Sequence, residues 1–305
     1  MSHVFGPVPS RRLGRSLGVD LVPYKTCTYD CVYCQVGCTT RQTLERAEWV
    51  PMEAVLRDLQ AKLETRPDTI TLSGSGEPTL YSRIGELIAH IKRLTDIPVT
   101  VLTNGSLLWR DEVRAELLGA DLVVPSLDAG DDAMFRKVNR PHEELTFEQV
   151  LGGLIEFRRE FEGKYWLEVF LLSGCTDTSA EVTKLVRCAG RIGPDKVQLN
   201  TVTRPPAEDF ARPVSRERLF EFATMFEPPA EVIADFDRPA DAPAASASAE
   251  DILEMLRRRP CSVDDVAHGL NIHPHEAAKR LAELLDAGRV ETTRVGKTYY
   301  YGVSS

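Results

Sequence analysis

Residues 27–34 read Cys-Thr-Tyr-Asp-Cys-Val-Tyr-Cys, which places three cysteines at the spacing C-x3-C-x2-C soon after an apolar run. A short loop at the end of a strand can fold three thiolates toward one centre, and such soft ligands select iron–sulfur clusters or zinc. Structural zinc sites usually add a second C-x2-C pair, and no such pair follows in the sequence. The stretch therefore predicts a metal centre held by Cys27, Cys31 and Cys34.

The chain of 305 residues is long enough for one large domain and one small domain. Its 43 % hydrophobic and 27 % charged residues are typical of a soluble globular protein, and its apolar runs are too short for a membrane span. The N-terminus shows no basic-then-apolar secretory signal, so we expect reduced cysteines and a cytoplasmic location. A net charge of −9 excludes a general polyanion-coating protein but permits a local basic groove.

Six strand-like apolar runs alternate with helical patterns along most of the chain. The expected strands are 19–23, 69–72, 99–102, 121–124, 166–172 and 196–202. The expected helices are 51–64, 82–94, 111–118, a segment after Thr146, 180–192 and 216–226. Strands that alternate with helices favour parallel βα units, and six such units predict an α/β fold of the partial (β/α)6, TIM-like barrel type.

The opening of the chain, residues 5–18, is rich in glycine, proline and arginine, and this composition predicts an extended loop before the first strand. Arg11, Arg12 and Arg15 lie within five positions of one another. Guanidinium groups pair well with phosphate or carboxylate, so the loop either binds an anion or only leads into the first strand.

A second, smaller unit is expected after residues 237–249, which are rich in Ala, Pro and Ser and indicate a linker. Helices are predicted at 251–258, from Ser262, and at 274–285, with a hairpin over 288–301. This order resembles a winged helix-turn-helix. The predicted organisation is a core domain 1–235, a linker 236–249 and a winged-helix-like domain 250–305. Residues 250–305 carry eight Lys/Arg against nine Asp/Glu, a net charge of about −1 that leaves nucleic acid and protein partners both open.

Small and polar residues follow the expected strands, which is where α/β barrels build their sites. Residues 73–78 read Ser-Gly-Ser-Gly-Glu-Pro, and glycine lets the backbone approach a ligand closely. Asn104, Ser126 and Asp128 follow the third and fourth strands. These residue types also form ordinary turns, so a binding role and a turn role both remain open.

The last two expected strands carry further candidates. Glu168 lies inside an otherwise apolar strand, on the face opposite its apolar neighbours, where a charge would need a partner. Gln198 and Asn200 share one face of the next strand, and Arg204 just beyond it can neutralise a carboxylate or a phosphate. The last three residues either face the barrel lumen or are exposed at its edge.

The cysteine spacing, with Tyr33 just before the last cysteine, resembles the radical S-adenosylmethionine (SAM) superfamily. The resemblance implies a [4Fe-4S] cluster with three irons held by Cys27, Cys31 and Cys34, and a fourth iron that chelates SAM. The stretch 73–78 looks like the glycine-rich GGEP-type motif of that family, although Ser75 departs from the tightest pattern. The implied SAM-binding residues are Tyr33 near the adenine, Gly74, Gly76 and Glu77 at the methionine end, and Asn104, Ser126 and Asp128 at the ribose, the carboxylate or the substrate.

Cys38 extends the run by a fourth cysteine. If Cys38 bound the fourth iron, SAM would lose its coordination site and the cluster would serve electron transfer alone. The downstream motifs favour SAM binding, so we expect Cys38 to be a bystander.

The resemblance implies that an electron donor such as flavodoxin or ferredoxin reduces the cluster. SAM is then cleaved to methionine and a 5′-deoxyadenosyl radical, which abstracts hydrogen from a substrate. Residues 4–210 also resemble a poorly characterised group often placed near tRNA wyosine-base synthases, which carry a second cluster on further N-terminal cysteines that are absent before Cys27. Three hypotheses follow: an enzyme acting on tRNA or other RNA, or on another substrate presented with help from the winged helix; an enzyme that modifies or activates a protein; or a DNA-binding iron–sulfur redox sensor.

Overall fold

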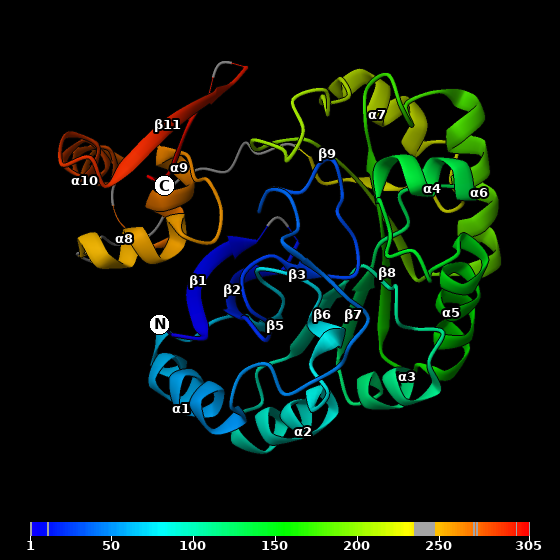
Figure 1. Cartoon of the computed structure of the whole chain (residues 1–305), viewed down its shortest axis with the longest axis horizontal. Coiled ribbons are helices and arrows are strands. Elements are labelled where there is room, and N and C mark those ends of the chain that lie inside the picture. The colour runs from blue at the N-terminus through cyan, green and yellow to red at the C-terminus, as the bar shows by residue number, and fades with distance from the viewer. Residues whose placement is uncertain are drawn as a thin grey trace.

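The computed structural model describes residues 2–10, 12–234, 248–270, 272, 274–296 and 298–304. Its centre is an eight-stranded sheet in the order β1-β2-β5-β6-β7-β8-β9-β10 (Figure 1). The strands are β1 (Val4–Ser10), β2 (Gly14–Val19), β5 (Thr69–Leu72), β6 (Val99–Thr103), β7 (Leu122–Pro125), β8 (Lys164–Leu171), β9 (Lys196–Thr201) and β10 (Glu231–Val232). All neighbours from β2 to β10 pair in parallel, and β1 pairs antiparallel with β2. The predicted α/β class with a parallel sheet is confirmed.

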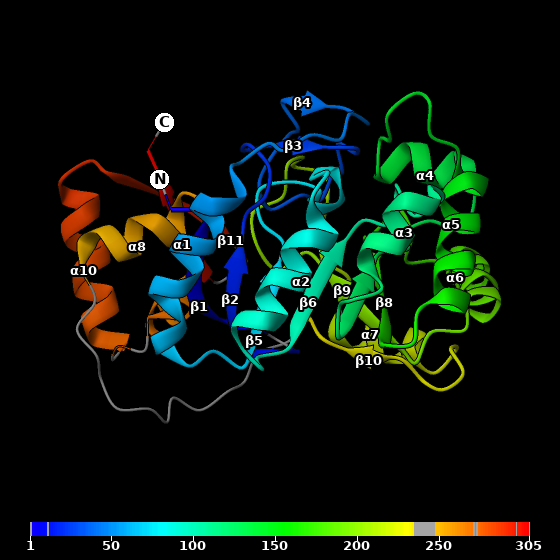
Figure 2. The same cartoon turned by 90° about the horizontal axis from the view of Figure 1, so that it is seen from below.

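Helices connect the parallel strands and cover the outer side of the sheet, as Figures 1 and 2 show together. They are α1 (Met52–Lys62), α2 (Ile84–Leu94), α3 (Asp111–Leu117), α4 (Asp132–Val138), α5 (Phe147–Glu160), α6 (Ser179–Ile192) and α7 (Arg216–Ala223). Short 3-10 turns lie at η1 (Leu63–Thr65) and η2 (Pro78–Leu80), and β3 (Thr26–Cys27) pairs with β4 (Arg41–Gln42). The helix expected after Thr146 begins there with a capping box to Gln149.

Two expectations for the N-terminal part are wrong. Residues 5–18 form most of β1 and β2 instead of a loop, because proline is tolerated in an edge strand and at a bulge, and β1 is an edge strand with a bulge between Phe5 and Val8. Gly18 is required there, since a Cβ would lie 2.1 Å from the Phe5 ring. The strand expected at 19–23 ends at Val19, where its partner β5 also ends.

Burial along the strands defines an outer and an inner face. In β8, Tyr165, Leu167, Val169 and Leu171 are buried against the hydrophobic core, and the residues between them are less buried. This alternation places Glu168 on the inner face, opposite the helices. The inner face is therefore the place where polar side chains from neighbouring strands meet.

The C-terminal segment, defined here as the described residues from 248 to 304, contains α8 (Ala249–Leu256), α9 (Val263–Gly269), α10 (Pro274–Asp286), β11 (Val290–Val295) and β12 (Thr298–Val303). It has its own hydrophobic cluster, which includes Ile252, Val266 and Leu281. Helices α8 and α9 pack beside β1 (Figures 1 and 2). The predicted linker 236–249 falls outside the described residues, except at Ser248 and Ala249, where α8 begins. No helix in the described part of the chain is long and apolar enough to cross a bilayer.

Candidate active site

The three clustered cysteines lie in a loop that is held against the carboxyl end of β5. The backbone N–H of Glu77 donates to the carbonyl of Thr26 at 3.2 Å, which fixes the start of the loop. The N–H of Cys34 donates to the carbonyl of Cys31 at 3.1 Å and closes a turn. Cys27, Cys31 and Cys34 are all free thiols and partly buried. These contacts keep the loop that carries the three cysteines at the carboxyl end of β5.

Two asparagine amides donate to the sulfur atoms of this loop. Nδ2 of Asn104 lies 3.5 Å from Sγ of Cys27 and 2.8 Å from Oγ1 of Thr28. Nδ2 of Asn139 lies 3.5 Å from Sγ of Cys31. Such donors stabilise a thiolate and adjust the properties of a cluster bound to it. Asn104, expected to contact SAM, is thus directed at a candidate cluster ligand.

The donor set fits an iron–sulfur cluster. Burial and the nearby carboxylate of Glu77 raise the pKa of Cys27 to about 12, and burial also raises the pKa of Cys31 and Cys34. Thiolates in these surroundings need a positive partner, which iron supplies. Among the described residues, no group of three or more His, Cys, Asp or Glu is arranged to hold a metal ion. Thiolates are the ligands that hold iron–sulfur clusters, so a set of three cysteines suits a cluster.

Cys38 differs from these three cysteines in its surroundings. It is exposed, whereas the other three are partly buried. Its Sγ lies 3.9 Å from the carbonyl oxygen of Ala207. This position supports the expectation that Cys38 is a bystander.

The buried carboxylate of Glu77 joins three pieces of the site. Its Oε1 accepts from the N–H of Thr79 at 3.0 Å and from the hydroxyls of Thr79 and Thr103, each at 2.6 Å. Its Oε2 accepts from the N–H of Asn104 at 2.7 Å. Burial raises the pKa of Glu77, and these hydrogen bonds oppose the shift. Because both oxygens already bind the chain, the expected contact with the SAM ammonium stays a prediction.

The glycines of the 73–78 loop are required by packing within the chain. A Cβ on Gly76 would lie 1.8 Å from the carbonyl oxygen of Thr26, and one on Gly74 would lie 2.6 Å from the carboxylate of Asp20. Ser75 donates from its hydroxyl to Asp20 at 2.6 Å, so the departure from the family motif supplies a hydrogen bond. The sequence suggests ligand approach as the reason for glycine, and the structure adds the close contact with the cysteine loop.

Asp128 is the centre of a buried polar network beside the cysteines. Its carboxylate accepts from the hydroxyl of Tyr33, from Nδ2 of Asn139 at 2.8 Å and from the N–H of Phe170 at 3.0 Å. Burial raises the pKa of Asp128 to about 6 against the effect of these hydrogen bonds. The Tyr33 ring stacks on Phe170 with 4.0 Å between centroids. Asp128 therefore orients both Tyr33 and an amide that donates to a cysteine sulfur.

The polar residues of β8 and β9 meet on the inner face of the sheet. Glu168 forms an ion pair with Arg12 and accepts from Nδ2 of Asn200 at 3.0 Å. Arg12 also donates to Gln198 at 3.2 Å. Glu168 thus has the partner that its position requires. Gln198 is buried and Asn200 is partly buried, so neither is exposed at an edge.

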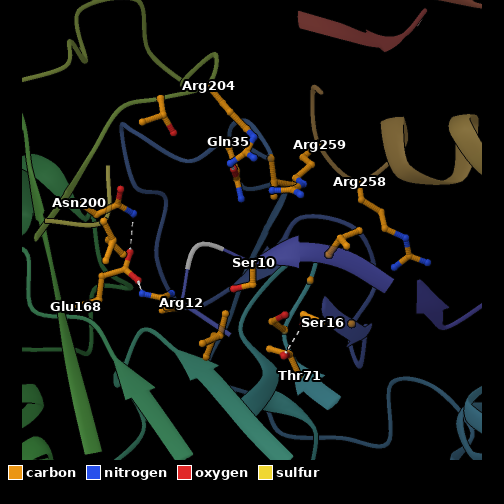
Figure 3. Close-up of a pocket in the computed structure, with 18 of the residues that line it drawn as sticks. Ser10, Arg12, Ser16, Gln35, Thr71, Glu168, Asn200, Arg204, Arg258 and Arg259 are labelled. Atoms are coloured by element: carbon orange, nitrogen blue, oxygen red, sulfur yellow. Dashed lines mark hydrogen bonds and ion pairs between the residues drawn. The ribbon is translucent and has the colours of Figure 1, made fainter. Parts of the chain in front are cut away.

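A cavity of about 400 Å³ opens beside the cysteine loop (Figure 3). Its walls come from β1 and β2, from the loop residues 33–36, from the carboxyl ends of β8 and β9, and from the C-terminal segment. Its charged lining residues, among those described, are Arg12, Glu168, Arg204, Arg258 and Arg259. A volume of this size is in the range of small-molecule sites.

The cavity brings together only part of the predicted set. The predicted residues that line it are Cys34, Tyr33, Gly74, Glu168, Asn200 and Arg204. Those that do not line it are Cys27, Cys31, Gly76, Glu77, Asn104, Ser126, Asp128 and Gln198. Most residues of this second set instead form the hydrogen bonds and close contacts within the chain that are described above. The hydroxyl of Ser126 forms no hydrogen bond with the described residues, and its N–H donates to the carbonyl of Thr103 at 3.1 Å.

Several residues of the site are missing from the sequence-based prediction. Asn139 follows α4, a helix that the sequence does not predict, and no local pattern marks it. Arg12 belongs to the arginine-rich opening, which gave a general signal for anion binding. Arg258 and Arg259 lie in the run 257–259, whose location beside the cavity depends on how the C-terminal segment docks.

The fold places three partly buried thiols in a loop at the carboxyl end of a parallel sheet, beside a cavity. This arrangement fits a protein that binds a metal cluster. A family model described as the Radical SAM superfamily matches residues 21–201, more than half of the chain. The chain belongs to the Radical SAM superfamily. Enzymes of this superfamily use a [4Fe-4S] cluster and S-adenosylmethionine, and this chain is an enzyme of that type.

Individual proteins show the same likeness. The chain is 39 % identical to a GTPase Obg of Brachyspira hyodysenteriae over 99 % of this chain and 45 % of that protein, so it spans under half of that relative. It is 36 % identical to a UPF0026 protein of Methanocaldococcus jannaschii over 74 % of this chain and 71 % of that protein. A radical SAM methyltransferase from Sphaerobacter thermophilus shares the fold, with a TM-score of 0.54, 20 % identity and coverage of 73 % of this chain and 67 % of that one.

Proposed function

We propose that Cys27, Cys31 and Cys34 hold a [4Fe-4S] cluster, and that the chain uses it with SAM to abstract hydrogen from a substrate bound in the adjoining cavity. The observation that carries this proposal is the pair of amide donors, Asn104 and Asn139, that lie 3.5 Å from two of the partly buried cysteine sulfurs. Chain-derived donors at these sulfurs suit thiolates bound to iron.

The surrounding residues have distinct roles in this proposal. When bound, the cluster and SAM supply the reductive cleavage that yields methionine and a 5′-deoxyadenosyl radical. Asp128 holds Tyr33 against Phe170, beside the place proposed for the adenine. Gly74 and Ser126 leave polar backbone and a hydroxyl for the nucleoside and amino-acid ends of SAM. Glu77 fixes the loop that carries Asn104.

The domain organisation is also a proposal. The parallel strands and outer helices support a core of residues 1–235 with a partial (β/α)6 barrel, and the separate hydrophobic cluster of α8, α9 and α10 supports a second domain over 250–305. Three helices followed by the two-stranded β11–β12 sheet support a winged-helix type for that domain. We include a soluble electron donor such as flavodoxin or ferredoxin and a cytoplasmic location in this proposal.

The test is electron paramagnetic resonance of the anaerobically reconstituted, reduced full-length chain with and without SAM. SAM bound to an open iron changes the cluster signal, so the spectrum should shift on addition of SAM. The same addition to Ser126→Ala should require a higher SAM concentration, since one hydroxyl is removed. A reduced cluster whose spectrum is unchanged at saturating SAM would contradict an open iron site and favour a cluster that only transfers electrons.

We further propose that RNA is the substrate, or that the substrate is attached to an RNA molecule. The winged-helix-like order of elements favours nucleic acid, whereas the charge of about −1 over 250–305 does not. The test is binding of unmodified tRNA by the full-length chain over a range of salt. Binding that weakens steeply with salt supports RNA. No tRNA binding at low salt favours the protein-modifying alternative. Membership of an enzyme superfamily weighs against the redox-sensor hypothesis.

A further inference from the structure

Two arginines from separate parts of the chain lie beside each other at one end of the cavity. Arg204 follows β9, and Arg259 follows α8 in the C-terminal segment. Both line the cavity, and Figure 3 shows both beside Gln35 of the cysteine loop. Arg259 lies close enough to Arg204 to be affected by its charge. The C-terminal segment therefore contributes a charged group to the cavity of the core.

The Arg204 side chain is largely buried, and only some of its N–H groups have a hydrogen-bond partner. Its side chain is 10 % exposed, forms an ion pair with Asp265 at 2.9 Å and donates to Oε1 of Gln35 at 3.3 Å. Its Nε atom is buried and has no hydrogen-bond partner among the described residues. A buried donor without an acceptor is unfavourable, so this guanidinium has capacity for another ligand.

The positive charge of Arg259 is offset by fewer ion pairs than that of the other arginines that line the cavity. Arg12 pairs with Glu168, and Arg258 pairs with Asp20 at 3.4 Å. Arg259 forms no ion pair with any described residue, and its side-chain partner is the thiol of Cys261. Burial and the charge of Arg204 lower the pKa of Arg259, and Cys261 and the carboxylate of Asp265, which also pairs with Arg204, oppose this shift. One carboxylate, that of Asp265, thus faces two guanidinium groups, and a further anion would offset the remaining repulsion.

We infer that Arg204 and Arg259 bind a phosphate or carboxylate group of a small substrate, so that the C-terminal segment forms part of the substrate site. This inference rests on the function proposed above, because it takes the cavity as the substrate site. Guanidinium groups bind both kinds of anion in the same bidentate way. A cavity of about 400 Å³ suits a metabolite-sized molecule.

The experiment uses the reconstituted full-length chain and three variants. Arg259→Gln removes the charge, Arg259→Lys keeps it, and Arg257→Gln is the matched control. Arg257 is the neighbouring arginine, pairs with Glu250 at 2.7 Å and does not line the cavity. The probes are pyrophosphate and succinate, and calorimetry measures their dissociation constants. Thermal unfolding without probe checks that each variant is folded.

The wild-type chain and Arg257→Gln should bind at least one probe equally well. Arg259→Gln should weaken this binding by about tenfold or more, and Arg259→Lys by less, because a charged hydrogen bond is lost or only altered. The stronger probe identifies phosphate or carboxylate as the group recognised. No binding by the wild-type chain, or equal binding by folded Arg259→Gln, would overturn the inference.

The SAM carboxylate is the competing occupant, because the cavity also borders Cys34. Saturating SAM should leave the binding of the probe unchanged, and Arg259→Gln should bind SAM as the wild-type chain does. Competition between SAM and the probe would assign the arginines to SAM and overturn the inference. These binding measurements need no radical chemistry, so their failure is separate from a failure to form 5′-deoxyadenosine.

Discussion

At the residue scale, the site depends on side chains whose hydrogen bonds are already used within the chain. Asp128 and Asn139 connect a candidate adenine contact, Tyr33, to a sulfur of the cysteine loop. Their positions mean that substitutions near the cluster change both its surroundings and the shape of the SAM site. The surroundings of each residue therefore distinguish the candidate cluster ligands from the residues that only hold those ligands in place.

Replacing each of the four cysteines by alanine, one at a time, should show which of them bind the cluster. Cys27→Ala, Cys31→Ala and Cys34→Ala should lose the bound iron, because two thiolates cannot hold the cluster. Cys38→Ala should keep it, since Cys38 is exposed and lies against Ala207. Iron and sulfide content after anaerobic reconstitution measures this. Loss of iron from Cys38→Ala would show four cysteine ligands and no open site.

Site residues that lie close together in the sequence could be predicted from it. Site residues that only the fold brings together could not. Three cysteines within eight residues are local, so their convergence needs only a short loop. Asn139 lies 108 positions from Cys31, and only the packing of the loop after α4 brings its amide to the sulfur. Glu77 was found through its motif, but its four hydrogen bonds to the chain follow from the register of β5 and β6.

At the scale of elements, the 73–78 loop lies so close to β3 that position 76 has to be glycine. Gly76→Ala would place Cβ 1.8 Å from a backbone oxygen of Thr26, and neither side can move without breaking the cysteine loop. We expect destabilisation of about 2–4 kcal/mol and weaker retention of the cluster, in line with other overpacked sites. Urea unfolding of the cluster-free chain and iron content measure the two effects.

Gly152 provides the control for this prediction. It lies inside α5 with nothing within 4 Å of an added Cβ. Gly152→Ala should stabilise the chain by about 0.5–1 kcal/mol, because alanine favours the helix more than glycine does. If Gly76→Ala were as stable as Gly152→Ala, the described contact between the two loops would be wrong.

The βα units were predictable because their apolar periods differ clearly between strand and helix. The order of β5 to β9 and the long helices α1, α2, α5 and α6 agree with the expected ranges. The edge strand β1 was not predicted, because its composition is that of a loop and its stability comes from β2 and the C-terminal segment. Helix α4 has only seven residues, too few for a clear period.

At the scale of the whole molecule, the C-terminal segment packs beside the edge of the sheet through a few polar contacts. Arg258 pairs with Asp20, donates to the carbonyl of Ser2 at 2.8 Å and lies over the Phe5 ring. The hydroxyl of Tyr300 donates to the carbonyl of Thr203 at 2.5 Å. No sequence pattern predicts this docking, because it combines residues from both ends of the chain.

Arg258→Ala should loosen this docking by about 1–3 kcal/mol, because it leaves a partly buried carboxylate, Asp20, without its cation. Amide hydrogen exchange should rise in β1 and α8 and stay unchanged in β7. Arg257→Ala should have little effect, since its ion pair with Glu250 is exposed. Equal exchange in β1 for Arg258→Ala and the wild-type chain would show that this contact does not hold the segment.

The most direct test of the central claim is the formation of 5′-deoxyadenosine by the reconstituted full-length chain with dithionite and SAM. The proposed function predicts 5′-deoxyadenosine and methionine in equal amounts from the wild-type chain and from Cys38→Ala. It predicts none above background from Cys31→Ala. A wild-type chain that carries a full, reduced cluster and binds SAM but forms no 5′-deoxyadenosine would contradict it.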